Sequence, residues 1–218
     1  MKKPALSDEI LKSSTDVWDR MQACRFVADI EADTLDPEAF RRYLVHENMF
    51  VETAILIFGY MLVKAPDLET RRRVVRILKA LSEDQIAYFH DTFEALGMKE
   101  SEWRDLEMPA AVAAFRDGML ATAAHGTYAE IVASMFAAEW MYWTWCMRAS
   151  AGIISDPLVR EWVELHTGQD FTSQASWLRE QLDQAGEHMD EPARQRVARL
   201  FRNVLELEIT FHDASYPA

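Results

Sequence analysis

The sequence predicts an all-α fold, a single-domain helical bundle of seven or eight helices that spans residues 1–218. Glycine and proline number only seven each in 218 residues, which leaves little material for the turns of an all-β protein. Apolar residues recur at helical spacing, and an acidic residue followed by proline marks several helix starts. Half of the residues are hydrophobic, enough for a large core, and no linker or internal repeat divides the chain.

The first two helices are predicted from their N-terminal capping residues and from an interruption in the helical spacing of apolar residues. Ser7 or Asp8 can cap a first helix, whose apolar positions continue to about Met21. The stretch EADTLDPEAF then breaks the pattern. An aspartate and a proline at 36–37 start a long second helix that ends near Lys64.

The remaining six helices are marked by similar start and end residues. Pro66 and Asp67 precede a third helix, Gly97 is a plausible C-terminal glycine for it, and Thr127 opens the most apolar helix of the chain. The expected ranges are about 67–97, 109–126, 127–150, 157–168, 169–185 and 191–213.

Charge and composition exclude several classes of partner. The formal net charge is −13, which would repel a nucleic acid because phosphate contacts supply most of the affinity for it. The most apolar stretches contain Glu52 or Glu139 and fall short of the roughly 20 residues that a bilayer requires. The two cysteines have no metal or redox spacing, and no secretory signal begins the chain. We therefore expect a soluble, cytoplasmic protein without nucleic-acid or membrane partners.

Three long helices each carry one glutamate on an otherwise apolar face. Glu139 lies in the middle of the run ASMFAAEWMYWTWCM, Glu47 falls within the apolar stripe of the second helix, and Glu208 shares a face with Phe211. A buried, unpaired carboxylate is costly, so each acid must be neutral, paired or directed into a wet pocket. A structural acid bonded to a tryptophan, a tyrosine or a helix end is the alternative interpretation.

A metal centre is a second interpretation of the polar residues. Helical bundles hold di-iron centres with carboxylate and imidazole ligands from several helices. The corresponding donors here are Glu83, His90, Glu139, His166 and Asp170. The usual Glu-x-x-His pair is absent, as are a glycine-rich phosphate loop, a serine elbow and a Cys-x-x-Cys pair.

Four segments in order resemble the TenA family, which includes thiaminase II and its aminopyrimidine-salvage relatives and has the haem-oxygenase-like all-α fold. The segments are W…FV..I..DTLDPEAFRRYLVHENMFV at 18–51, YAEIVASMFAAEWMYW at 128–143, WVELHTGQDF at 162–171 and ELEITFHDASY at 206–216. The resemblance covers nearly the whole chain.

The resemblance assigns roles to individual positions. Glu47 falls where the family has its pyrimidine-binding aspartate, Glu208 falls on the catalytic glutamate, and Phe211 falls on the aromatic residue that stacks on the pyrimidine. Tyr142 matches a pocket tyrosine, and the nucleophilic cysteine of the thiaminase branch is Ala138 here. Three further tyrosine positions of the family are occupied by Phe50, Phe115 and His166.

Because this cysteine is absent, the sequence resembles the cysteine-less branch of the family. By that resemblance Glu139 would pair with Glu208 as an acid/base couple. The resemblance implies hydrolysis of an aminomethyl- or formylaminomethyl-pyrimidine in thiamin-precursor salvage, by a homotetramer without a cofactor. Cleavage of thiamin itself is doubtful, because no thiol nucleophile is in place. Two alternatives remain. One is a di-iron oxygenase of the same fold, with two Fe and with Ser173 in place of its last histidine; the other is a non-catalytic pyrimidine-binding protein.

Overall fold

The computed structural model describes residues 4–104 and 106–217, and every regular element in this part of the chain is helical. A π-helical segment, η1 (Leu81–Gln85), joins α5 to α6, and a single 3-10 turn, η2 (Glu100–Glu102), precedes α7. The α-helices are α1 (Leu6–Ser13), α2 (Thr15–Gln22), α3 (Arg25–Glu31), α4 (Pro37–Lys64), α5 (Leu68–Ala80), α6 (Ile86–Ala95), α7 (Ala110–His125), α8 (Tyr128–Ala149), α9 (Pro157–Thr167), α10 (Gln169–Glu187) and α11 (Glu191–Asp213).

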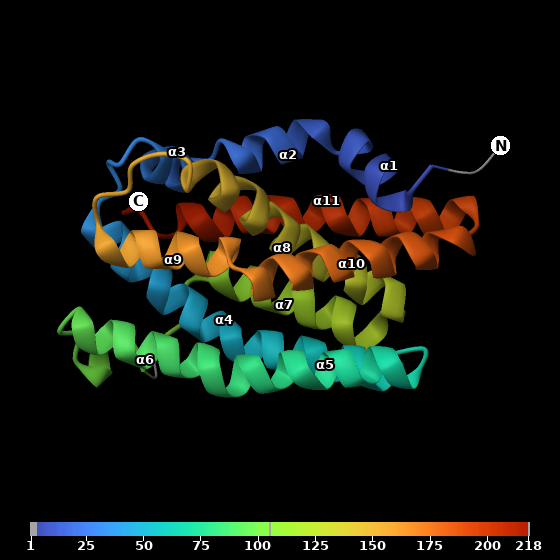
Figure 1. The fold of residues 1–218 in the computed structure, drawn as a ribbon, viewed down its shortest axis with the longest axis horizontal. Helices are drawn as coiled ribbons and strands as arrows, with labels where there is room; N and C mark the ends of the chain where they lie inside the picture. Colours follow the sequence, from blue (N-terminus) through green and yellow to red (C-terminus); the bar gives the residue numbers. More distant parts are fainter. Residues whose placement is uncertain (1–3, 105, 218) are drawn as a thin grey trace.

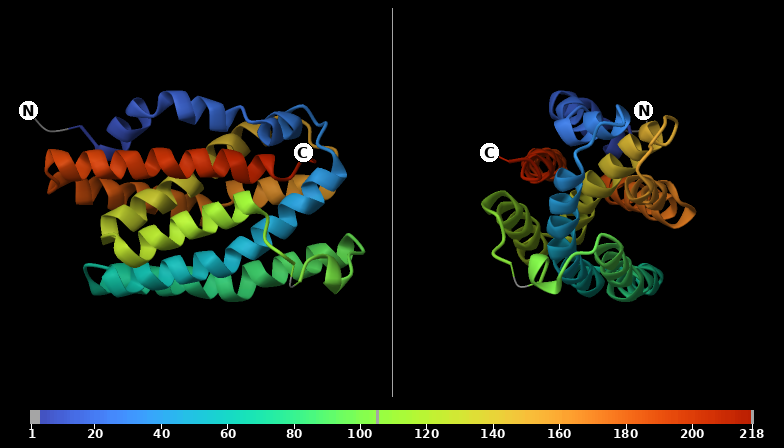
Figure 2. Two further views of the ribbon diagram at one scale, coloured as in Figure 1. Left: turned by 180° about the vertical axis from the view of Figure 1, so that it is seen from behind. Right: turned by 90° about the vertical axis from the view of Figure 1, so that its left-hand side faces the viewer.

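The helices form an elongated bundle around α8. Figure 1 shows α1–α3 along one long edge and α5–α6 along the opposite edge, with α4 and α8 crossing between them. The described ends of the chain lie at opposite ends of the bundle, and the end-on view in Figure 2 shows the other helices gathered around α4 and α8. The central position of α8 follows from its sequence, because residues 131–139 are all buried and a helix that is apolar on every side must be surrounded.

Most predicted helix starts are confirmed, and several of them show the expected hydrogen bond from a backbone N–H to the capping side chain. The side chain of Asp36 accepts from the Glu38 N–H, and that of Asp67 accepts from the Thr70 N–H. Thr127 forms a reciprocal capping box with Glu130 at the start of α8. Gly97 adopts the left-handed conformation with a φ of 66°, as expected for a residue that ends a helix.

The predicted first helix is wrong in two respects. Up to Met21 the segment forms two short helices that are divided at Ser14, and a third short helix, α3, follows a break at the Ala23–Cys24 junction, so that the chain follows α11 and α8. Ser7 does not cap: its backbone N–H and hydroxyl both donate to Asp183 of α10, and Ala5 occupies the cap position. This division, together with the π-helical segment, accounts for eleven α-helices in the described residues where seven or eight were expected.

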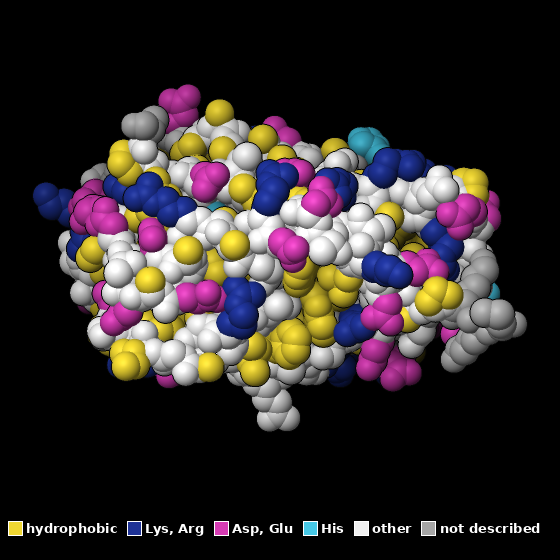
Figure 3. All heavy atoms as spheres, turned by 90° about the horizontal axis from the view of Figure 1, so that it is seen from above, with side chains coloured by type: hydrophobic (Ala, Val, Ile, Leu, Met, Phe, Trp, Pro, Cys, Tyr) yellow, Lys and Arg dark blue, Asp and Glu magenta, His cyan; other side chains and the backbone are white. Residues whose placement is uncertain are grey.

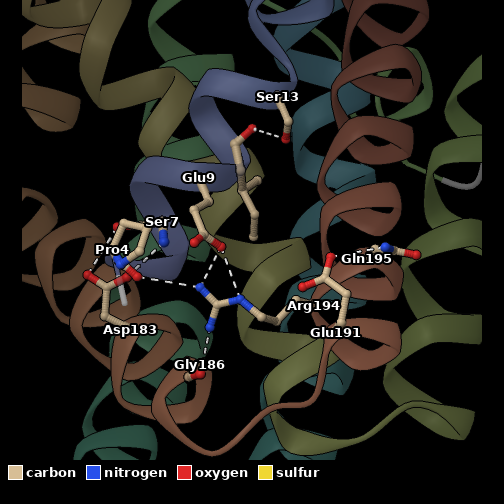
Figure 4. A network of polar contacts seen from close by, with 10 residues as sticks. Pro4, Ser7, Glu9, Ser13, Asp183, Gly186, Glu191, Arg194 and Gln195 are labelled. Carbon is tan, nitrogen blue, oxygen red and sulfur yellow. Dashed lines mark hydrogen bonds and ion pairs between the residues drawn. The ribbon is translucent and has the colours of Figure 1, made fainter. Parts of the chain in front are cut away.

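A buried arginine ties the N-terminal segment to the turn between α10 and α11. The Arg194 guanidinium lies among Glu9, Pro4 and Gly186, as Figure 4 shows. It forms an ion pair with Glu9 and donates to the Gly186 carbonyl at 2.7 Å. Gly186 is required at this contact, since an added Cβ would lie 2.6 Å from the Leu6 Cβ. The network therefore fixes α1 on the end of the bundle.

We expect Arg194→Met to lower the free energy of unfolding by about 2 kcal/mol, because it leaves Glu9 and a buried carbonyl without their donor. Urea unfolding followed by circular dichroism measures the change. Arg199→Met, at an exposed position of the same helix, is the control and should change stability little. Equal effects of the two substitutions would show that the network does not stabilise the fold.

Candidate active site

A cavity of about 340 Å³ lies within the bundle and is lined by side chains of α4–α11 and of η1. Seven of the eight residues that the sequence placed in the site line this cavity. They are Glu47, Phe50, Phe115, Glu139, Tyr142, His166 and Glu208. Asp84 and Asp170, which are both exposed, also belong to the lining and mark its outer part.

Phe211 occupies a different place from the one expected for a stacking residue. It is fully buried and lies behind the cavity wall, with its ring centroid 5.3 Å from that of Phe115 and 6.5 Å from that of Phe50. Phe50 and Phe115 stack on each other at 4.5 Å and do line the cavity. This pair therefore supplies one part of the aromatic lining, and Phe211 packs against both of its rings.

Glu47 is held by two tyrosine hydroxyls. Tyr142 donates to Glu47 Oε1 at 2.5 Å and Tyr43 donates to the same oxygen at 3.1 Å, while the two hydroxyls are 2.8 Å apart. Burial raises the pKa of Glu47 to about 7, and the bonds from Tyr142 and Tyr43 oppose that rise. Since Oε1 is committed to the tyrosines, Oε2 is the oxygen available to a ligand.

Glu208 has the least polar surroundings of the three acids. Its side chain is 1% exposed, and Oε2 has no hydrogen-bond partner among the described residues. His212 Nδ1 lies 3.7 Å from that oxygen but bonds to the Glu208 backbone carbonyl at 2.7 Å. Burial and then the charge of Glu47 raise the pKa of Glu208 well above its ordinary value. Glu208 therefore holds its proton more strongly than an exposed glutamate does.

Glu139 lies at another part of the cavity wall, against α10. The Gln174 amide donates to Glu139 Oε1 at 2.7 Å, while Oε2 is buried and has no partner in residues 4–104 and 106–217. Burial raises the pKa of Glu139 to about 8, although the Gln174 bond and the charge of Arg73 both lower it. An apolar helix can hold this acid because the side chain of Glu139 is mostly uncharged at neutral pH.

The expected pairing of Glu139 with Glu208 stays a prediction. The carboxyl group whose charge acts on Glu208 is that of Glu47, and the groups that act on Glu139 are Gln174 and Arg73. In all three acids the largest cause of the raised pKa is burial rather than a neighbouring carboxylate. We call Glu47 with Glu208 one acidic centre of the cavity, and Glu139 with its donor Gln174 the other.

His166 contributes a neutral imidazole to the aromatic wall. Its ring lies 5.1 Å from that of Tyr142, nearly parallel to it, and 4.2 Å from that of Trp162. Nδ1 is 2.7 Å from the Trp162 carbonyl, so this nitrogen carries the proton and Nε2 can only accept. Burial lowers the pKa of His166 to about 4.

The five donors of the metal interpretation do not come together. Glu139, His166 and Asp170 line the cavity, but Glu83 is exposed on η1 and pairs with Lys79. His90 is also exposed, and its ring packs against Trp103 at 5.1 Å. Within the part of the chain that the structure describes, no group of three or more His, Cys, Asp or Glu side chains is arranged to hold a metal ion.

Three residues that line the cavity or bond to its acids were not predicted from the sequence. Tyr43 precedes Glu47 by four residues, and this helical spacing was a signal that could have revealed it. Tyr88 lines the cavity with a buried hydroxyl that has no partner among the described residues. Gln174 had no local signal, because only the packing of α10 on α8 brings it to Glu139.

The all-α bundle has the haem-oxygenase-like fold. A domain with this fold from Shewanella denitrificans superimposes with a TM-score of 0.75 at 12% identity, over 96% of this chain and 91% of the other. A TenA homologue from Pyrococcus furiosus superimposes with a TM-score of 0.88 at 20% identity, over 97% of this chain and 100% of the other.

The family is established by sequence. The model of the TENA/THI-4/PQQC family matches residues 11–218, so the chain belongs to this family. It is also 21% identical to the aminopyrimidine aminohydrolase of Halalkalibacterium halodurans over 202 residues, which cover 92% of this chain and 90% of that enzyme. The resemblance and the fold predicted from the sequence are both confirmed.

The raised pKa values predict how stability depends on pH. Glu47 and Glu139 keep their protons to about pH 7 and 8 in the folded chain, whereas the ordinary pKa of this carboxyl is 4.5. Between these values the folded state binds more protons than the unfolded state, so the free energy of unfolding falls as pH rises from 5 to 8. Glu139→Gln has no such proton to lose, and we expect a shallower fall in urea unfolding at pH 5, 6.5 and 8.

Glu164→Gln, at an exposed position of α9, is the matched control and should keep the dependence of the wild-type protein. A Glu139→Gln protein that still loses stability as steeply as the wild type would show that Glu139 is ionised throughout this range.

Proposed function

We propose that the protein is an aminopyrimidine hydrolase of thiamin-precursor salvage, which cleaves the exocyclic C–N bond of an aminomethyl- or formylaminomethyl-pyrimidine. The observation that carries the proposal is the placement of Glu47 and Glu208 in one cavity with aromatic walls, where the charge of Glu47 raises the pKa of Glu208. Such a couple supplies a proton acceptor and a proton donor at neutral pH. The named activity of the related enzyme from Halalkalibacterium halodurans supports the same reaction class.

The roles of the residues follow from their surroundings. Glu47, held from one side by Tyr142 and Tyr43, would bind the amino group and ring nitrogen of the pyrimidine. The stacked pair Phe50 and Phe115 would form a flat wall for the ring, and the rings of Tyr142 and His166 another. Glu208, which has no competing side-chain donor among the described residues, would take the proton of the attacking water.

A covalent route through a thiol receives no support from the geometry. The position of the family's cysteine is Ala138, which lines the cavity. Cys146 is fully buried two helical turns further along α8, and burial raises the pKa of its thiol well above the ordinary value. Direct attack of water needs only acid and base groups, and the proposed reaction requires neither a metal nor an organic cofactor.

We also propose that the chain is a cytoplasmic homo-oligomer, a tetramer by resemblance to its family, with one domain over residues 1–218. Both cysteines are free and buried, which suits a reducing compartment. Leu56, Tyr60 and Val63 form an exposed apolar stripe on α4, 55%, 40% and 78% exposed, that a second copy could cover. Residues 1–3, 105 and 218 of the proposed domain lie outside the described residues.

Neither a nucleic acid nor a membrane is a proposed partner. Figure 3 shows basic and acidic side chains interspersed on one face, around exposed hydrophobic side chains, which is no uniformly basic surface. In residues 4–104 and 106–217, no helix combines the length and the apolar character that crossing a bilayer demands.

The test is a substrate panel of thiamin, aminomethyl-pyrimidine and its formyl derivative, with release of ammonia or formamide followed by mass spectrometry. We expect turnover of one or both pyrimidines and none of thiamin. Glu208→Gln should lower kcat by about 100-fold or more, because a positioned acid or base contributes that much. Glu47→Gln should raise KM more than it lowers kcat.

Glu206→Gln is the control, since Glu206 lies two residues from Glu208 but pairs with Arg20 at the surface. Tight binding of hydroxymethylpyrimidine with no turnover of either precursor would instead assign the cavity to a binding protein.

A further inference from the structure

The hydrogen bond between Gln174 and Glu139 determines which carboxyl oxygen carries the proton. The Gln174 amide nitrogen can donate a hydrogen bond but cannot accept one, so Glu139 Oε1, 2.7 Å away, must be the acceptor. A neutral carboxylic acid has one carbonyl oxygen and one hydroxyl oxygen. The hydroxyl oxygen is therefore Oε2, which is buried and has no partner among the described residues.

The start of α10 holds the Gln174 amide in a fixed position. Thr172 accepts from the Trp143 indole at 3.1 Å, which joins this turn to α8. Ser173 accepts from the Arg73 guanidinium at 2.9 Å, which joins it to α5. Three consecutive residues of α10 are thus bonded to the helices on either side of the cavity, and the donor to Glu139 has little freedom to turn away.

We propose that Gln174 is a positioning residue that confines the proton of Glu139 to Oε2, so that Glu139 acts as the acid for the departing nitrogen of the substrate. This rests on the proposed hydrolase function and assigns the two acidic centres of the cavity to opposite sides of the scissile bond. The ring lies at the centre formed by Glu47 and Glu208, and the nitrogen leaves toward Glu139.

The chemical step balances with these groups alone. Water forms a C–O bond to the exocyclic methylene carbon and gives its proton to Glu208 when that carboxylate is ionised. The C–N bond breaks with its electron pair on nitrogen, and the proton on Glu139 Oε2 neutralises that nitrogen. The products are the hydroxymethyl-pyrimidine and ammonia or formamide, and a proton exchanged with solvent restores both acids.

Other ionisable groups face the same space and must be considered in any pH profile. Arg73 of α5 acts on Glu139 directly and lowers the pKa of its carboxyl group. The titratable side chains that line the cavity from the surrounding elements are Glu47, Asp84, Tyr88, Tyr142, His166, Asp170 and Glu208. A variant at Gln174 leaves all of these unchanged, which makes it a sharper test than a variant of either acid.

Gln174→Met keeps roughly the length of the side chain and removes its amide group, including the donor to Glu139. Infrared spectroscopy reports the carbonyl stretch of a neutral carboxylic acid, and Glu139→Gln identifies the band of Glu139 by its disappearance. Because a hydrogen bond to the carbonyl oxygen lowers this frequency, we expect the Glu139 band to shift upward in Gln174→Met. Gln195→Met is the matched control, since Gln195 donates to Glu191 Oε1 at 3.0 Å on the exposed side of α11.

Kinetics provide the second readout. We expect Gln174→Met to lower kcat by about tenfold with KM changed less than threefold, as the loss of one hydrogen bond predicts. The alkaline limb of the pH profile should move to higher pH, because removal of the Gln174 bond removes an interaction that lowers the pKa of Glu139. A residue that merely stabilises the fold would not move this limb.

The outcomes separate the two proposals. A wild-type enzyme that hydrolyses the pyrimidines, combined with an unshifted Glu139 band or an unchanged alkaline limb in Gln174→Met, overturns the role of Gln174 and leaves the hydrolase function intact. If the wild-type protein turns over no pyrimidine, the hydrolase function and the acid role fall together. The infrared shift in that case still decides whether Gln174 fixes the proton on Oε2.

Discussion

The constraint on which the rest of this structure depends is the burial of three carboxyl groups inside a helical bundle. Water solvates an ionised carboxylate far better than the interior of a protein does, so each buried acid must give up its charge or find donors. Glu47 has two tyrosine donors, Glu139 has one amide, and Glu208 has no side-chain donor closer than 3.7 Å among the described residues. The bundle offsets this cost with a large apolar core centred on α8.

Different surroundings separate the proton affinities of three chemically identical side chains. Burial acts on all of them, and the number of donors then distinguishes one from another: the pKa is about 7 for Glu47, about 8 for Glu139 and well above the ordinary value for Glu208. Separated affinities are what allow one pocket to hold an acid and a base at the same pH. The aromatic wall contributes to this separation because it keeps water away from the carboxyl groups.

The sequence revealed the acids because each interrupts an apolar stripe, and it revealed most helix starts because aspartate and proline have specific roles there. Periodicity gives the face of a helix but not the depth of a side chain. The family resemblance assigned Phe211 to the ligand surface, and periodicity could not test that depth; Phe50 and Phe115 line the cavity, whereas Phe211 is fully buried against them. Periodicity also does not identify neighbours across helices, so the carboxyl group that acts on Glu208 and the amide that binds Glu139 emerged only from the packing of α4, α10 and α11 on α8.

The replacement of the family's thiol by Ala138 changes what the remaining residues must do. A covalent route divides the reaction into two steps, so one acid can serve the departing group and then the water in turn. Direct displacement needs the base and the acid within one step, which a single carboxyl group cannot supply because both act at once on opposite sides of the reacting carbon. Three carboxyl groups line this cavity, so the proposed reaction has more than one group from which to draw its base and its acid. In the proposed reaction, the neutral Glu139 beside Ala138 would give its proton to the departing nitrogen, so that no covalent intermediate is needed.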